Sequence, residues 1–142
     1  MRILLIGEFS RLHNSLKEGL ELLGHEVCIV ANGDGFKNYP VDLSTRAKWF
    51  ETKIGLFFKK VLYKTIGFDL LKLEFGIRFY FHLNKLKNYE VVQLINEAPI
   101  QTIPWLERYL LKKIFRQNKD AYLLCCGVDY LVAKHLVEKK ER

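Results

Sequence analysis

Hydrophobic and polar positions along the first forty residues alternate between strand and helix patterns. Residues 2–7 (RILLIG) form a continuous apolar run that ends at a glycine, which is typical of a strand buried on both faces. Leu16, Leu20 and Leu23 then recur at helical spacing, and residues 27–31 (VCIVA) form a second apolar run. A strand, a helix and a strand in succession predict a βαβ unit with parallel strands.

Short sequence signals predict where this first helix begins and ends. Ser15, with Glu18 three positions later, has the form of a capping box, in which two side chains satisfy the free N–H groups of a helix start. Gly24 is placed to end the helix, because glycine readily adopts the left-handed conformation found after helix ends. We therefore expect the helix to begin near Ser15 and to end before Gly24.

The remainder of the chain continues the alternation. Residues 73–82 alternate at a strand period, but the length of the segment exceeds that of ordinary strands and favours a helix. We expect one domain with a Rossmann-like three-layer α/β/α fold and a mostly parallel sheet of about four or five strands. The further helices are expected at 44–66, 69–86, 104–116 and from about 130 to Arg142, and the further strands at 41–43, 91–95 and 121–126.

Composition indicates a compartment. The chain has 142 residues, of which 49% are hydrophobic, as expected for one packed domain. Its apolar stretches are too short for a secretory signal or a membrane span. Cys28, Cys125 and Cys126 lie in strand-like runs, which indicates reduced thiols in a cytoplasmic protein. No Cys/His spacing resembles a zinc site, so we expect no metal.

The positive charge is concentrated in one part of the sequence. The net charge is +7, and residues 46–88 hold ten basic side chains against three acidic ones, which leaves the rest of the chain neutral. Three interpretations remain open: a surface on an anionic membrane, a nucleic-acid face without any accompanying motif, or packed helices with solvated lysines. In the first interpretation the membrane-facing residues are Lys53, Lys59, Lys60 and Lys64.

Candidate binding residues follow from the ends of the predicted strands. In open parallel sheets, ligands bind beyond the carboxyl ends of the strands, which here are the loops 7–10, 96–97 and 127–129. Their carboxylates and amides suit hydroxyl-rich ligands. The alternative is that the glycines only end strands and the carboxylates are only solvated. The candidates are Gly7, Glu8, Ser10, Asn96, Glu97, Gly127 and Asp129, together with His13, for which a structural role is the alternative.

Several activities lack the residues they need. Gly7 is followed by no second glycine, and Asn32 stands where a dinucleotide site has its ribose-binding carboxylate, which argues against NAD binding. The chain also has no phosphate-binding glycine loop with Lys-Ser/Thr and no G-x-S-x-G elbow. We therefore expect no cofactor.

Taken in order, these segments resemble the N-terminal domain of GT-B glycosyltransferases of the retaining, family 4-like kind. The resemblance covers about 1–43 and 89–130. In such proteins the strand near residue 91 lies beside the first strand. The segments that carry it are MRILLIGEFS (1–10), LKEGL (16–20), LGHEV (23–27), YEVVQLINE (89–97) and YLLCCGVD (122–129).

The resemblance implies a bacterial enzyme that builds a capsule or another polysaccharide. In that family the N-terminal domain holds the sugar or lipid-linked acceptor, and a second Rossmann-like domain, not expected in this chain, holds most of the nucleotide-sugar donor. Gly7, Glu8 and Ser10 would face the donor diphosphate, and the chain alone would be inactive. The basic segment would dock on the inner face of the cell membrane. The alternative function is a non-catalytic membrane- or partner-binding α/β module, and no nucleic-acid partner is expected.

Overall fold

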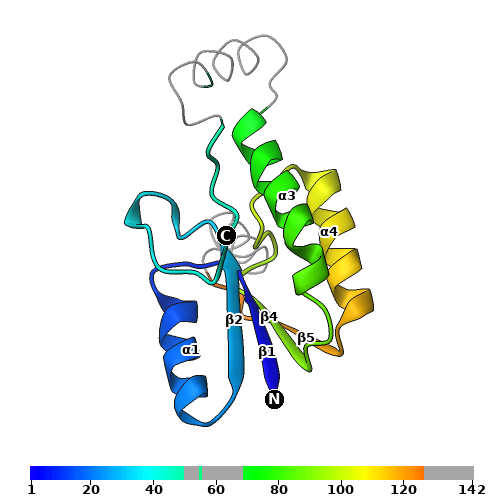
Figure 1. Ribbon diagram of the computed structural model, residues 1–142. Coiled ribbons are helices and arrows are strands. Elements are labelled where there is room, and N and C mark those ends of the chain that lie inside the picture. Colours follow the sequence, from blue (N-terminus) through cyan, green and yellow to red (C-terminus); the bar gives the residue numbers. More distant parts are fainter. Residues whose placement is uncertain (50–54, 56–68, 127–142) are drawn as a thin grey trace, which may run out of the picture.

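The centre of the fold is a parallel β-sheet. The computed structural model describes residues 1–49, 55 and 69–126. The strands lie side by side in the order β3-β2-β1-β4-β5, which is the order of the first five strands of a Rossmann fold. Figure 1 labels β2, β1, β4 and β5 of this sheet. The prediction that the segment near residue 91 lies beside the first strand is confirmed, because Ile3 pairs with Val91. The strands are β1 (Arg2–Ile6), β2 (Glu26–Ala31), β3 (Leu43–Ser44), β4 (Val91–Leu94) and β5 (Asp120–Leu123).

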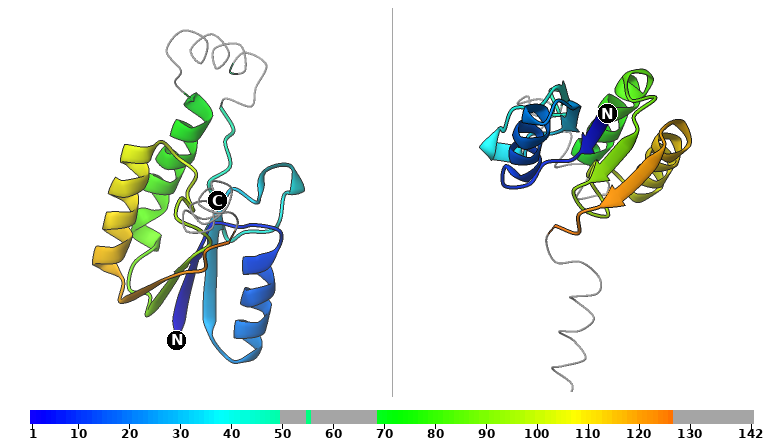
Figure 2. Two further views of the ribbon diagram at one scale, coloured as in Figure 1. Left: turned by 180° about the vertical axis from the view of Figure 1, so that it is seen from behind. Right: turned by 90° about the horizontal axis from the view of Figure 1, so that it is seen from below.

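Helices cover both faces of the sheet and complete the predicted three-layer α/β/α fold. One face is covered by α1 (Leu12–Leu22), and the other by α3 (Leu70–His82) and α4 (Pro104–Gln117). Figure 2 shows α3 and α4 side by side on the face opposite α1. Two short 3-10 helices, η1 (Gly35–Lys37) and η2 (Leu83–Lys85), follow β2 and α3.

The apolar run of β1 divides its side chains between the two helical layers. Leu4 and Ile6 belong to the core under α3 and α4, whereas Ile3 and Leu5 belong to the core under α1. All four side chains are buried. A strand with helices on both faces has no solvent side, which explains why every residue of β1 after Arg2 is apolar.

The end of α1 follows the prediction, but its beginning does not. Gly24 adopts φ +81°, its N–H donates to the carbonyl of Glu21, and the N–H of His25 donates to that of Leu20. This is the Schellman arrangement of a helix end. The predicted capping box is wrong, because the helix begins at Leu12, so Ser15 lies inside the helix and not at its start.

The helix expected from residue 69 is confirmed as α3. Asp69 caps it by accepting hydrogen bonds from the backbone N–H groups of Leu71 and Lys72. Gly76 brings α3 against α4, since a Cβ there would lie 2.3 Å from Thr102 Oγ1 and 2.4 Å from a methyl carbon of Leu106. The apolar residues that alternate along 73–82 therefore belong to a helix that is buried on more than one side.

The helix predicted from Ser44 does not begin there. Residues 45–49 are not helical. Thr45 N–H donates to the carbonyl of Ala31, and the N–H groups of Lys48 and Trp49 donate to the buried carboxylate of Glu74. A side chain 26 positions away thus takes the backbone donors that a helix would have used. Gly55 is helical, and the rest of the predicted segment lies outside the described residues.

Residues 121–126 were expected to form a buried strand, and this is wrong in two respects. The strand ends at Leu123, and all its residues are exposed, with Tyr122 at 58%. Among the described strands β5 pairs with β4 alone, and it lies last in the strand order. The cysteines beyond it, Cys125 and Cys126, are free, as is Cys28. The last predicted helix lies outside the described residues.

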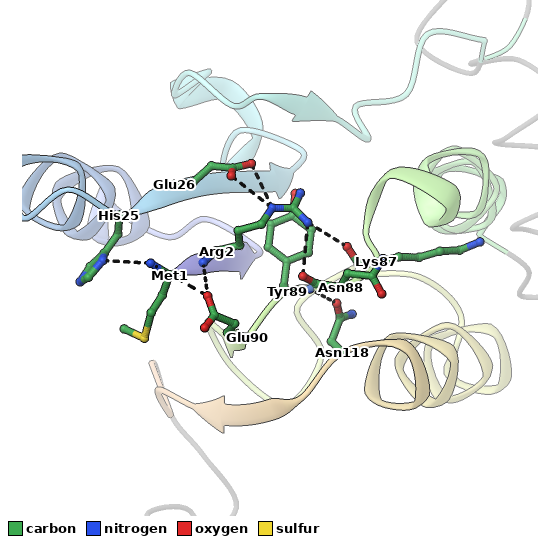
Figure 3. Close-up of polar contacts among 9 residues, drawn as sticks. All are labelled: Met1, Arg2, His25, Glu26, Lys87, Asn88, Tyr89, Glu90 and Asn118. Carbon is green, nitrogen blue, oxygen red and sulfur yellow. Dashed lines mark hydrogen bonds and ion pairs between the residues drawn. The ribbon is translucent and has the colours of Figure 1, made fainter.

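A polar cluster ties the strands together at the amino-terminal edge of the sheet (Figure 3). The guanidinium of Arg2 lies 4.6 Å from the ring centre of Tyr89 and donates to the Glu26 carboxylate. The backbone N–H of Arg2 donates to the side chain of Glu90 at 2.8 Å. These contacts join β1, β2 and the start of β4, so this edge serves the register of the sheet.

Candidate functional site

The candidate site lies at the opposite, carboxyl-terminal edge of the sheet. Gly7 ends β1 with φ +87°. A Cβ at this position would lie 2.4 Å from Ile95 Cγ2 and 3.0 Å from the carbonyl oxygen of Pro99. Any side chain there would therefore clash with the segment that follows β4. Gly7 therefore lets the loops after β1 and β4 lie in contact, and the predicted candidates of these two loops share one edge of the sheet.

Glu8 points into the protein, and both its carboxylate oxygens accept hydrogen bonds from groups at the start of α1. One oxygen accepts from the N–H groups of Phe9 at 2.8 Å and His13 at 3.3 Å. The other accepts from the backbone N–H of Asn14 at 2.9 Å and from the Asn14 side-chain amide. Glu8 is 1% exposed. It supplies the cap for α1 that the sequence assigned to Ser15.

This cap has a direct consequence for phosphate binding. In dinucleotide-binding folds, the pyrophosphate lies at the N-terminus of the first helix, where free N–H groups and the helix dipole favour an anion. Here the carboxylate of Glu8 takes that place, and its charge is satisfied by Phe9, His13 and Asn14. The start of α1 is therefore already occupied by an anion from the protein itself.

Ser10 lies in a polar cluster with residues that follow β2. Ser10 and Arg11 both have positive φ, 50° and 67°, which turns the loop toward β2. The backbone N–H of Ser10 donates to Asp34 at 2.8 Å. Lys37 bonds both to Asp34, at 2.9 Å, and to the Ser10 hydroxyl, at 3.1 Å. Burial acts to raise the pKa of Asp34, but Lys37 and the Ser10 amide outweigh it and lower that pKa.

A second contact joins the loops after β2 and β4 across the end of β1. The side-chain amide of Asn32 donates to the side-chain oxygen of Gln101 at 2.9 Å. The oxygen of Asn32 accepts from the backbone N–H of Asp34. Gln101 is exposed and has a φ of 61°, so its backbone is held in an uncommon conformation. The edge therefore presents amide groups beside the Asp34–Lys37 pair.

Asn32, Asp34, Lys37 and Gln101 were not among the predicted site residues. The segment 32–35 (Asn-Gly-Asp-Gly) has the composition of a turn, which gives no sign of a binding role by itself. Two signals were present: the segment follows the second strand, and strand ends are where ligands bind in such sheets.

His13 is part of the interior and not of the surface. Its side chain is fully buried, and Nδ1 lies 2.6 Å from the carbonyl oxygen of Gly7. Since a carbonyl only accepts, Nδ1 carries the proton, and Nε2 is a buried acceptor without a hydrogen-bond partner among the residues that the structure describes. Burial lowers the pKa of His13, against smaller opposing effects of Gly7 and Glu8. The ring is therefore neutral at neutral pH and supports the first loop from within.

The other predicted site residues divide into two groups. Asn96 and Glu97 follow β4 at the same edge; Asn96 is half-buried and accepts from the Ala98 N–H, while Glu97 is exposed. Gly127 and Asp129 lie outside the described residues, as do the membrane-facing candidates Lys53, Lys59, Lys60 and Lys64.

The described residues offer binding groups more readily than reactive ones. Burial raises the pKa of the Cys28 thiol, although a hydrogen bond with Tyr89 opposes this, so the thiol is a poor nucleophile at neutral pH. Within residues 1–49, 55 and 69–126, no three His, Cys, Asp or Glu side chains come together as a metal site would require. No helix in the same part of the chain combines the length and hydrophobicity of a membrane span.

Comparison of the chain with protein-family models, with curated proteins and with solved structures found no match. A function therefore has to be argued from the geometry above and from the sequence resemblance.

Proposed function

We propose that this chain is the acceptor-side, Rossmann-like domain of a glycosyltransferase, and that the carboxyl-terminal edge of its sheet binds a sugar. The observation that carries this proposal is the capping of α1 by Glu8. An edge whose helix start is already filled by a carboxylate is unsuited to a diphosphate, but it leaves neighbouring amides and hydroxyls available. The ligand class that such groups fit is a hydroxyl-rich, uncharged one.

The exposed groups at this edge support a sugar ligand. Ser10, Glu97 and Gln101 are exposed, and they present a hydroxyl, a carboxylate and an amide. Phe9 and Phe36, the neighbours in sequence of Ser10 and Lys37, add exposed aromatic rings, 42% and 90% accessible. Aromatic rings can cover the C–H face of a sugar while the polar groups bind its hydroxyls.

The proposed reaction divides the work between two domains. This domain positions the acceptor hydroxyl, and a second domain, outside these 142 residues, binds the nucleotide-sugar and its diphosphate. The resemblance implies that Glu8 faces the donor diphosphate, and we assign Glu8 a structural role in place of that one. Glu8 instead holds the first loop in shape, while Ser10 and the loop after β4 contact the acceptor.

The test is a titration of the isotope-labelled chain, followed by amide NMR shifts. The probes are polysaccharide fragments, UDP-glucose and NAD. We expect the fragments to shift the amides of Ser10, Asp34 and Gln101, and UDP-glucose and NAD to leave the α1 amides unmoved. E97Q should weaken fragment binding severalfold. The matched control is E90Q, which changes an exposed glutamate at the other end of β4. The introduced amide oxygen can still accept from the Arg2 N–H, so E90Q should not affect fragment binding.

Two outcomes would contradict the proposal. Shifts of the His13 and Asn14 amides with NAD or UDP-glucose would show that the start of α1 binds phosphate after all. The absence of shifts with every fragment, or equal losses in E97Q and E90Q, would remove the sugar site from this edge.

A further inference from the structure

Two adjacent cysteines follow β5 at the carboxyl-terminal edge of the sheet, and both carry free thiols. Cys125 is exposed and Cys126 is half-buried. The third cysteine of the chain, Cys28, lies in β2, and the strands β1 and β4 stand between β2 and β5. Three strand spacings amount to about 14 Å, which is well beyond the Cα separation of about 7 Å at which two cysteines can still pair. Within one chain, Cys125 and Cys126 are therefore partners for any reaction that needs two sulfurs.

The backbone around this pair is fixed against the segment that follows β4. The N–H of Leu124 donates to the carbonyl of Leu94 at 2.9 Å, and the N–H of Cys126 donates to that of Ile95 at 3.0 Å. Two positions on one side thus match one position on the other, which leaves one extra residue, as in a β-bulge. That residue is Cys125, with a φ of 56°. Neighbouring side chains of a strand point to opposite faces, and the left-handed conformation of Cys125 ends this alternation between the two thiols.

A disulfide between the two neighbours is strained. Adjacent Cα atoms lie about 3.8 Å apart across a trans peptide, whereas disulfides ordinarily join Cα atoms that are about 4.4–6.8 Å apart. Strain of this kind makes a disulfide easy to reduce. The pair is therefore unsuited to a permanent structural link, and its chemistry is that of a dithiol with an exposed member.

Such a dithiol suits a soft centre that bonds to two thiolates at once. Thiolates prefer soft, thiophilic centres. An atom inserted between the two sulfurs also lets them lie further apart than a direct S–S bond does, which relieves the strain. Among the described residues, no third His, Cys, Asp or Glu completes a metal site with the pair. A centre that is satisfied by two sulfurs, such as trivalent arsenic bearing an organic group, therefore fits better than one that needs four ligands.

We propose that Cys125 and Cys126 form a vicinal-dithiol site that binds soft, thiophilic centres through both sulfurs. With phenylarsine oxide as the probe, each sulfur forms a bond to arsenic and the arsenic–oxygen double bond breaks. The two thiol protons leave with the oxygen as water. Arsenic stays trivalent and the sulfurs are not oxidised, so the reaction needs no oxidant or reductant. The site uses none of the residues proposed to bind sugar, and it does not depend on the proposed function.

Intact-mass spectrometry of the reduced full chain with phenylarsine oxide tests the site. We expect one adduct per chain, heavier by one phenylarsine oxide less one water. Ethanedithiol offers two linked sulfurs and should remove the arsenic, whereas the monothiol 2-mercaptoethanol at equal thiol concentration should leave it bound. Linked ligands gain on the order of 10²–10⁴-fold in affinity, so C125S and C126S should each lose a factor of that size. The matched control is C28S, which also removes one thiol and should bind the arsenical as before.

Amide NMR shifts locate the adduct on the unsubstituted chain. We expect the amides of Leu124, Cys126 and Asn96 to move, because Cys126 is hydrogen-bonded to Ile95 directly before Asn96. The amide of Ile29, the neighbour of Cys28, should stay unchanged.

Four results would overturn the proposal. They are the absence of an adduct, removal of the arsenic by 2-mercaptoethanol as easily as by ethanedithiol, equal losses of affinity in C28S and C125S, and shifts at Ile29 in place of Leu124. The two removal experiments use the unsubstituted chain, so they remain decisive if a serine variant fails to fold. Displacement of phenylarsine oxide by an equal concentration of Zn²⁺ would also count against a two-sulfur site, since zinc prefers four ligands.

Discussion

The two helical layers of this protein differ in where their acidic side chains lie. On the α1 side, Lys17 bonds to Asp42 at 2.6 Å and lies 3.6 Å from Glu21, and Arg11 bonds to Glu18 at 2.6 Å. On the α3–α4 side, the carboxylates face inward and the cations face solvent. A count of charges along the sequence cannot separate these cases. The exposed charge depends on which acids the fold buries.

Buried glutamates hold loops in both layers. Glu8 accepts from the start of α1, Glu74 from residues 48 and 49, and Glu107 from Ile100 and Thr102. Burial raises the pKa of Glu107, although the two N–H groups oppose that rise. Each of these acids satisfies donors that no regular secondary structure reaches, and its removal leaves those donors unpaired inside the protein.

The largest expected difference between the layers concerns their helix caps. E8A should lower the free energy of unfolding by about 3–5 kcal/mol, because several buried donors lose their acceptor. D69A removes an ordinary cap from α3 and should cost about 1 kcal/mol. Urea unfolding followed by circular dichroism measures both. A loss in E8A no larger than that in D69A would mean that Glu8 does not hold α1.

A smaller effect is expected from one methyl group on each layer. G76A places a Cβ within 2.4 Å of Thr102 and Leu106 and should destabilise the protein by about 1–3 kcal/mol. G19A adds the same methyl to α1, where no atom of the described residues lies within 4 Å, and should stabilise the protein by about 0.5–1 kcal/mol. Thermal unfolding should therefore move in opposite directions. Equal shifts of both variants would show that α3 and α4 are not in close contact at Gly76.

The smallest effect concerns the exposed charges themselves. E18Q removes the partner of Arg11 and should destabilise the protein by about 0.2–1 kcal/mol. Arg108, Lys112 and Arg116 follow one another at four-residue intervals on α4, and like charges at this spacing repel each other. K112Q removes the middle charge and should stabilise the protein by about 0.2–0.5 kcal/mol. Both changes should shrink in 1 M salt, because salt screens exposed charges. A destabilising K112Q would mean that the row on α4 has partners that contribute to folding.

The α/β class and the parallel sheet were predictable from the sequence, and the resemblance added the pairing of β1 with β4, while several side-chain roles were not predictable. Continuous apolar runs such as residues 2–7 identify strands buried on both faces, and the glycine at 24 identifies a helix end by a local mechanism. Glu8 could not be assigned in this way. A carboxylate after a strand looks the same in the sequence whether it faces a ligand or turns back to His13 and Asn14.

Long-range contacts account for the other errors. The backbone of residues 48 and 49 is held by Glu74, and no pattern near Ser44 indicates that. Tyr122 is exposed because its strand is the last in the sheet, and a strand's position in a sheet does not appear in its own residues. The amide pair of Asn32 and Gln101 joins two loops that are 69 positions apart.

The central place of β1 also has a consequence for how the chain folds. β1 can pair with β2 early, but its other neighbour is β4, and Arg2 bonds to Glu90 across 88 positions. The ribosome adds roughly 5–20 residues per second, so β4 is synthesised several seconds after β2, and one edge of β1 stays unpaired until then. During that time a strand whose residues 3–6 are all apolar has an open side. Ribosome-bound chains ending before residue 90 should therefore depend on chaperones more than longer ones do.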